Sequence, residues 1–126
     1  MPTRLHYDCL PPIAGPYVHA IRHRGVLYLS GLTAMGTAAE QGSLREQTRA
    51  ILALIGKVLA QEGRTVSDLI RINMYVCDIG ALAELRDVLR EFYQGVLPAS
   101  TLLEVSALIK PELNIEIEAT IAIEDE

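Results

Sequence analysis

The sequence has little of what several functional classes require. Its 126 residues include no tryptophan, one phenylalanine and two cysteines. Acidic residues outnumber basic ones, 16 Asp and Glu against 11 Lys and Arg, so the formal net charge is −5. This balance argues against non-specific nucleic-acid binding, which needs a basic patch.

Long hydrophobic runs are missing too. No apolar run approaches the ~18 residues that span a bilayer, and the N-terminal stretch lacks the basic-then-apolar order of a secretory signal. We therefore expect a cytoplasmic protein with no membrane partner. Cys9 and Cys77 show neither a CxxC motif nor metal-ligand spacing, so we expect two buried free thiols.

What is present is a core-forming pattern: half of the residues are apolar, enough for one domain over residues 1–126. Ser43 and Glu46 form a capping box that predicts a helix start, and Gly63 is a natural residue to end that helix. Heptad-like spacing predicts a second helix over 81–94. Alternating polarity predicts strands over the ranges 17–22, 26–30, 69–77, 100–105 and 115–123. A short edge strand within 1–12 is expected to precede them.

This order predicts an α+β fold, a mixed six-stranded sheet with two helices on one face. Two helices cannot cover both faces of six strands. The uncovered face is expected to carry alternate apolar residues and to be buried in a homo-oligomer. Within the 69–77 strand, Ile70 is expected to alternate with Arg71 and to share a face with Ile72.

Few residue clusters indicate chemistry without further comparison. Glu116 and Glu118 share one face of the last strand, where two carboxylates could act as acid and base if burial separated their pKa values; exposed strand carboxylates are the simpler interpretation. His19 and His23 are four residues apart, but they diverge on a strand that turns after Arg22. We therefore expect no metal site and no Ser-His-acid relay.

Taken together, the chain resembles the YjgF/YER057c/UK114 family, also called the Rid family (reactive intermediate deaminases). The resemblance covers nearly the whole chain through an ordered set of short motifs. They are Gly15-Pro16-Tyr17, Leu29-Ser30-Gly31, Glu46-Gln47-Thr48-Arg49, Asp68-Leu69-Ile70-Arg71, Met74-Tyr75-Val76-Cys77-Asp78, Phe92-Tyr93, Pro98-Ala99, Glu104-Val105 and Ile115-Glu116-Ile117-Glu118-Ala119.

The resemblance implies a chorismate-mutase-like fold and a homotrimer whose sheets form a central barrel. Three clefts between subunits would each bind a small molecule. In the best-known branch these clefts hydrolyse reactive enamines and imines, such as 2-aminoacrylate, to 2-keto acids and ammonia. The resemblance implies no cofactor and no metal.

The same resemblance assigns site residues. Tyr17 matches the cleft tyrosine, Ser30 the cleft serine with Gly31 beside it, and Glu116 the glutamate that places the hydrolytic water. Tyr17 and Glu116 are therefore the expected catalytic residues, and Ser30 and Gly31 are expected to contact the substrate.

The sequence departs from the family at the substrate anchor. The family motif Pro-Ala-Arg-Ser/Thr reads Pro98-Ala99-Ser100-Thr101 here, and a serine hydroxyl cannot replace a guanidinium as a carboxylate anchor. Ser100 and Thr101 are still expected to line the cleft. Arg86 stands where the deaminase branch has Asn, so the cation could have moved to the helix; Arg86 could equally be a solvated surface charge. Arg71 is a second basic candidate.

Three functions remain open. The first is an enzyme that adds water to the C=N bond of an imine or enamine with a non-standard substrate. The second is a small-molecule binding or sensing protein on the same scaffold. The third, suggested by older family names, is a nuclease or translation inhibitor, which the acidic charge disfavours.

Overall fold

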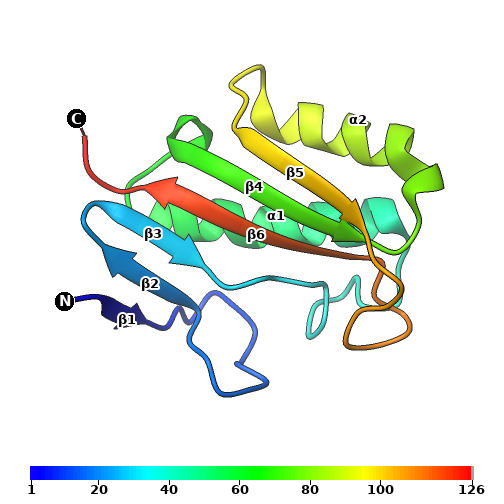
Figure 1. The fold of residues 1–126 in the computed structure, drawn as a ribbon, viewed down its shortest axis with the longest axis horizontal. Helices are drawn as coiled ribbons and strands as arrows, with labels where there is room; N and C mark the ends of the chain where they lie inside the picture. The colour runs from blue at the N-terminus through cyan, green and yellow to red at the C-terminus, as the bar shows by residue number, and fades with distance from the viewer. Residues whose placement is uncertain (126) are drawn as a thin grey trace.

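The computed structural model describes residues 1–125 and shows one mixed sheet with two helices (Figure 1). The six strands have the order β1-β2-β3-β6-β4-β5, and only the β4–β5 pair is parallel. The predicted α+β class and the mixed six-stranded sheet are confirmed. The elements are β1 (Thr3–Leu5), β2 (Ala20–His23), β3 (Val26–Leu29), α1 (Leu44–Gln61), β4 (Leu69–Val76), α2 (Leu82–Tyr93), β5 (Ala99–Glu104) and β6 (Ile115–Ala122), with short 3-10 turns at Val66–Asp68 and Ile79–Ala81.

The core lies between the sheet and the helices, and β6 is at its centre. Successive strand residues point to opposite faces, so β6 buries its odd-numbered apolar residues and turns its even-numbered residues to the other face. Ile115, Ile117 and Ile121 are fully buried against the helix side, where α1 contributes Ile51 and Ile55. Burying such side chains stabilises the fold by about 1.5–3 kcal/mol each. Within the described chain no helix is both long and apolar enough to cross a membrane.

The ends of α1 follow their predicted signals. The Ser43 hydroxyl accepts a hydrogen bond from the Glu46 amide at 3.1 Å, and the Glu46 carboxylate accepts one from the Ser43 amide at 3.0 Å. Both free amides are therefore satisfied. Gly63 follows the helix with φ +71°, a conformation that costs glycine little.

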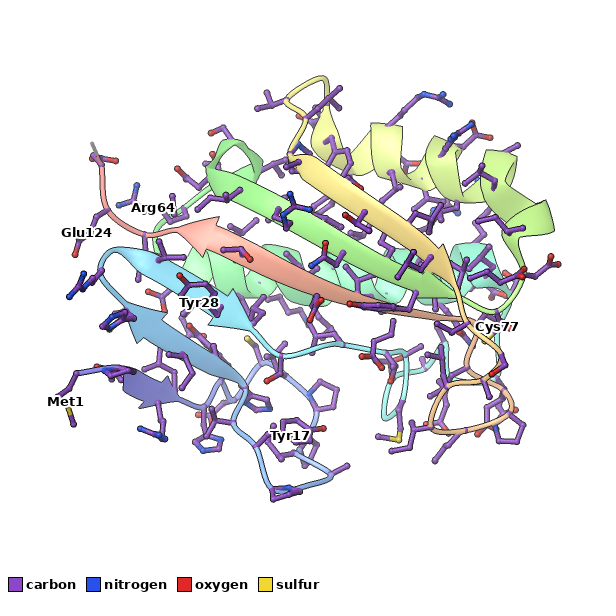
Figure 2. The ribbon with its side chains drawn as sticks, viewed as in Figure 1. Met1, Tyr17, Tyr28, Arg64, Cys77 and Glu124 are labelled. Atoms are coloured by element: carbon purple, nitrogen blue, oxygen red, sulfur yellow. The ribbon has the colours of Figure 1, made fainter. Side chains whose placement is uncertain are left out.

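The predicted strand over 17–22 begins too early. β2 starts at Ala20, because Pro16 has no amide hydrogen and the Tyr17 amide donates to the Gly15 carbonyl at 2.9 Å in a tight turn. Tyr17 consequently lies in a loop and is half-exposed (Figure 2). The hairpin that follows turns at Arg24 and Gly25, which both have positive φ.

Two further expectations about burial were wrong. The β4–β6 register shifts between Leu69 and Arg71, so the extra residue, Ile70, leaves the alternation and is 44% exposed. Cys9 and Cys77 are free thiols, but both are only partly buried.

The face of the sheet away from the helices is mixed rather than regularly apolar. Tyr28 on β3 and Leu103 on β5 are about half-exposed there, and Figure 2 shows Tyr28 on the side opposite α1. Between them lie the polar side chains of Glu116, Glu118 and Asn73, which the strand register places on the same face. The expectation of alternate apolar residues on this face is therefore only partly met.

One buried side chain joins the loops around the start of β6. Gln47 on α1 is fully buried, and its amide nitrogen donates to the carbonyls of Glu40 at 2.9 Å and Glu112 at 2.8 Å. Its amide oxygen accepts from the Asn114 amide at 2.7 Å. Gln47 thereby fixes two loops that otherwise share little regular structure.

Candidate functional site

A hollow of about 370 Å³ opens where the β3 end, the β6 start and two loops meet. It brings together four of the predicted site residues, which come from three separate parts of the chain. Its lining is Tyr17, Ser30, Gly31, Thr33, Met35, Ile109 and Glu116.

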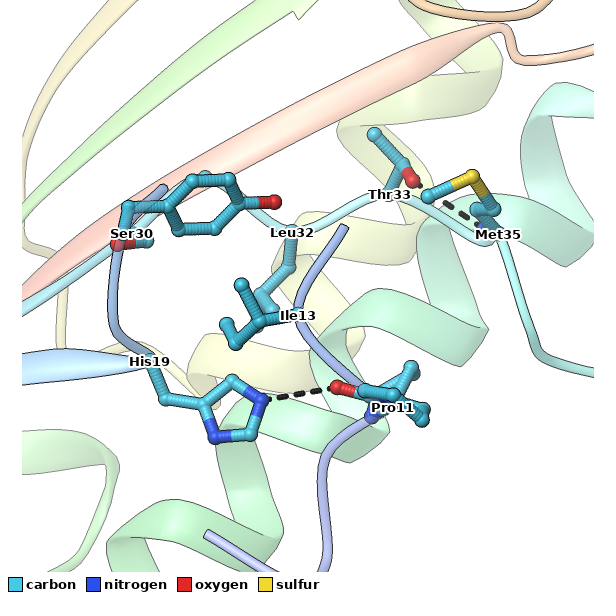
Figure 3. Close-up of a pocket in the computed structure, with 10 residues that line it drawn as sticks. Pro11, Ile13, His19, Ser30, Leu32, Thr33 and Met35 are labelled. Atoms are coloured by element: carbon cyan, nitrogen blue, oxygen red, sulfur yellow. Dashed lines mark hydrogen bonds between the residues drawn. The ribbon is translucent and has the colours of Figure 1, made fainter. Parts of the chain in front are cut away.

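A smaller hollow of about 50 Å³ adjoins it and shares several of its lining residues (Figure 3). Its own wall is largely apolar and comes from the segment after β1, with Pro11, Pro12 and Ile13 facing Leu32. The site thus has a polar part at Glu116 and an apolar recess beside it.

Glu116 supplies the ionisable group of the larger hollow. It lies on β6 opposite Tyr75 and is partly buried, and it accepts no hydrogen bond from any residue within 1–125. Burial raises the pKa of the Glu116 carboxyl above its usual range, and the negative charge of Glu118 raises it further. A carboxyl with a raised pKa and free lone pairs is suited to hold a water or a substrate nitrogen.

Glu118, two residues along the same face, is engaged differently. It accepts hydrogen bonds from the Tyr75 hydroxyl at 2.7 Å and from the Asn73 amide at 3.0 Å. The bond to Glu118 raises the pKa of Tyr75. The two glutamates therefore differ in their hydrogen bonds: Glu118 has two partners, and Glu116 has none within residues 1–125.

Gly31 allows the Glu116 carboxylate to sit in the hollow. A Cβ at position 31 would overlap Glu116 Oε2 and would lie 2.9 Å from its Cδ, closer than real Cβ contacts. The absence of a side chain at Gly31 therefore leaves the space that the carboxylate occupies.

Gly31→Ala is expected to push the Glu116 carboxylate out of its position and to weaken turnover or ligand binding at least tenfold, because small displacements of a reacting group are costly. Gly56→Ala is the matched control: its Cβ meets nothing within 4 Å on α1, and it should raise stability by about 0.5–1 kcal/mol. Ligand titration and thermal melting of both variants check this. Equal binding by the two variants would contradict the role given to Gly31.

Toward a ligand, the Ser30 hydroxyl can act only as a hydrogen-bond acceptor, because its one donor is used within the chain. The hydroxyl donates to the Val18 carbonyl at 2.6 Å, and the Ser30 amide donates to the His19 carbonyl at 3.0 Å. With its single O–H used, Ser30 Oγ retains lone pairs for a donor on a ligand.

His19 has a role that the sequence reasoning missed. The Tyr7 amide donates to Nδ1 at 2.8 Å, so the ring proton is on Nε2, which donates to the Pro11 carbonyl at 2.8 Å (Figure 3). The buried ring ties the segment after β1 to β2 and so holds the apolar wall of the smaller hollow. No local pattern signals a histidine that binds two backbone groups.

The other three predicted residues lie outside the hollow. Ser100 pairs with Ile72, which places it on the helix side of the edge strand β5. Thr101 lies on the opposite face and accepts a hydrogen bond from Arg71 at 3.1 Å. Arg86 is exposed on α2 and forms no hydrogen bond or ion pair with a residue within 1–125. One chain therefore groups Tyr17, Ser30, Gly31 and Glu116, but not these three.

Comparison with known proteins identifies relatives across almost the whole chain. The 2-iminobutanoate/2-iminopropanoate deaminase of Dermatophagoides farinae is 27% identical over 117 residues, which cover 90% of this chain and 91% of that protein. The protein of the same name from Bos taurus is 30% identical over 112 residues, covering 86% and 81%.

A solved structure shares both fold and sequence. A protein of unknown function of the conserved Rid protein family from Yersinia pestis superimposes with a TM-score of 0.87 at 29% identity, covering 97% of this chain and 99% of that one. The family model described as endoribonuclease L-PSP matches residues 10–123. The chain therefore belongs to this family, which is also known as the YjgF/YER057c/UK114 or Rid family.

Proposed function

We propose that the protein is a hydrolytic deaminase of a reactive imine or enamine, with a substrate that differs from the usual one because Ser100 replaces the anchoring Arg. The observation that carries this proposal is the free, partly buried Glu116 carboxyl held over Gly31. The two relatives named 2-iminobutanoate/2-iminopropanoate deaminase support the reaction class.

In the proposed reaction, Glu116 orients a water molecule against the carbon of the C=N bond and accepts a proton as the water adds. The nitrogen takes that proton to give the carbinolamine. Glu116 then moves the carbinolamine hydroxyl proton to the nitrogen, so that the C–N bond breaks, the carbonyl forms and ammonia leaves. The balance is one imine and one water giving one carbonyl compound and one ammonia. Tyr17 and Ser30 shape the cleft around the reacting atoms, and no cofactor takes part in these steps.

We further propose that the complete cleft lies between subunits of a homotrimer whose sheets form a central barrel. Ser100 lies on the sheet face opposite Glu116, Thr101 lies on the edge strand β5 and Arg86 on α2, so in this proposal a second copy brings these three residues to the hollow. The free edge of β5 and the exposed Leu97 and Leu103 beside it support such contacts.

Sedimentation equilibrium tests the assembly. At micromolar concentration we expect a mass close to three times the 13.8 kDa of the chain. A monomer under these conditions would remove the proposed cleft, since one chain alone does not group the seven residues.

The reaction is tested by ammonia release from imines that an amino-acid oxidase generates in place, with the keto acid followed in parallel. We expect wild type to accelerate release and Arg86→Ala to reduce it at least tenfold, because Arg86 then supplies the charge that Ser100 lacks. Ser100→Arg should restore turnover of these carboxylate-bearing imines in the Arg86→Ala background.

A binding or sensing protein on the same trimer is the second candidate, favoured by the loss of the charged anchor at Ser100. It predicts that wild type, Ser100→Arg and Arg86→Ala all stay at the background rate of ammonia release, with a ligand still bound in the hollow.

A further inference from the structure

The hollow around Glu116 also has a definite charge preference, and this inference rests on the proposed function. We propose that this half of the cleft is a cation site: it takes the protonated nitrogen of a small imine or primary amine, an iminium or ammonium N–H, against Glu116 and Ser30. The structure thereby assigns the orientation in which the substrate enters, with its nitrogen end at β6.

The first observation is that no basic side chain with a free donor lines either hollow. His19 is the one basic-type residue in the described lining, and both of its ring nitrogens are bound to backbone groups. On the same sheet face, Arg71 lies four residues along β4 from Tyr75, the neighbour of Glu116. That separation is about 13 Å along a strand. Within residues 1–125, an anionic group in the hollow would therefore meet no positively charged side chain.

The second observation is that two of the polar groups lining the hollow, Glu116 and Ser30, have lone pairs to offer. The Ser30 hydroxyl already donates its one hydrogen bond to the Val18 carbonyl, so its oxygen can only accept a hydrogen bond from a ligand. The Glu116 carboxylate offers two oxygens with no partner within residues 1–125. A partly buried carboxylate is stabilised most by a charged N–H donor, whose hydrogen bonds are about twice as strong as neutral ones.

The third observation is the charge behind Glu116. Glu118 is held on the same face by Tyr75 and Asn73, neither of which carries a positive charge. The field at the hollow is therefore negative, in keeping with a chain of net charge −5. Such a field attracts a small cation and repels a small anion.

The adjoining recess limits the rest of the ligand. Pro11, Ile13 and Leu32 give it an apolar wall, and its volume of about 50 Å³ has room for a few heavy atoms. The ligand class is therefore a short-chain alkyl ammonium or iminium ion, with its nitrogen at Glu116 and its alkyl chain in the recess.

The test compares two probes of equal length and opposite charge, n-butylammonium and butyrate, by NMR titration of the wild-type protein at pH 7.5 and low salt. The amide shifts of Gly31 and Glu116 report on this half of the cleft and not on the half proposed for Arg86, and by them we expect n-butylammonium to bind at least tenfold more tightly than butyrate. Glu116→Gln should lose that preference, because the amide keeps the shape and removes the charge. Glu91→Gln, which removes an exposed carboxylate on α2 away from the hollow, should retain it.

Butyrate binding as tightly as n-butylammonium to the wild type would overturn the inference, and this comparison needs no variant to fold. An n-butylammonium affinity that falls equally in Glu116→Gln and Glu91→Gln would also overturn the inference, because the loss would then follow from net charge alone. Ammonium binding without any imine hydrolysis upholds the cation site and removes the proposed reaction. Hydrolysis without an ammonium preference upholds the proposed reaction and removes the cation site.

Discussion

Glu116→Gln is expected to lower the rate of imine hydrolysis by a factor of about 10²–10⁴, the usual contribution of a positioned acid–base group. The amide fills the same space over Gly31 but cannot take a proton from the attacking water. Because the carboxyl is partly buried with no hydrogen-bond partner in the described chain, the folded state should not be harmed by the change. Steady-state ammonia release, with circular dichroism to verify folding, measures the effect.

Glu118→Gln is the matched control on the same strand face. Glutamine can still accept from Tyr75, so most activity should remain. Burial and the charge of Glu118 both raise the pKa of Glu116, so removing that charge should lower it. The acidic limb of the pH–rate profile should therefore move to lower pH in Glu118→Gln. A profile that does not move, or a loss of rate as large as in Glu116→Gln, would count against these separate roles.

Gln47→Leu is expected to destabilise the protein by about 3 kcal/mol, because buried polar groups without partners cost about 1–3 kcal/mol each. Leucine has nearly the shape of glutamine but makes none of its hydrogen bonds. The carbonyls of Glu40 and Glu112 and the amide of Asn114 would all lose a partner below 3.0 Å. Urea denaturation gives the change in free energy of unfolding. The protein concentration is kept the same for both proteins, because association would make the apparent stability depend on it.

Gln41→Leu provides the comparison for Gln47. Gln41 is exposed and makes one long contact, 3.4 Å to the Glu112 carboxylate, so its replacement should change stability by no more than about 0.5 kcal/mol. If the two leucine variants unfolded at the same urea concentration, Gln47 would not be the tie between the loops that the structure indicates.

Local signals predicted most of the fold. The alternation of β6, from Ile115 to Ile121, needs no tertiary information, because one buried face dictates a period of two. The Ser43 capping box and Gly63 likewise act within one turn of helix. These elements sufficed to predict the class and the mixed sheet.

Features that depend on tertiary partners escaped prediction. The bulge that exposes Ile70 arises from the register against β6, and the polarity of Ile70 itself predicts the opposite. Gln47 and His19 are polar residues that are buried because they satisfy distant backbone groups. No spacing in the sequence reports such partners.

The candidate site shows the same difference between residues that local motifs identify and residues whose placement depends on tertiary structure. Tyr17, Ser30, Gly31 and Glu116 were named from short motifs, and they lie together because the turn at Gly15 and the ends of β3 and β6 converge. Ser100 and Arg86 were named in the same way, but they lie outside that hollow. The register places Ser100 on the sheet face opposite Glu116, and the part that a second copy of the chain would play in bringing either residue to the hollow is a proposal.

The most direct test of the central claim is ammonia release from two imines made in place, one by an amino-acid oxidase and one by an amine oxidase, so that only the first carries a carboxylate. We expect the wild-type protein to raise the rate above the uncatalysed background for at least one imine, and Glu116→Gln to return it to that background. Background rates with both imines, from protein shown to be folded, would contradict the proposed deaminase and leave a binding protein.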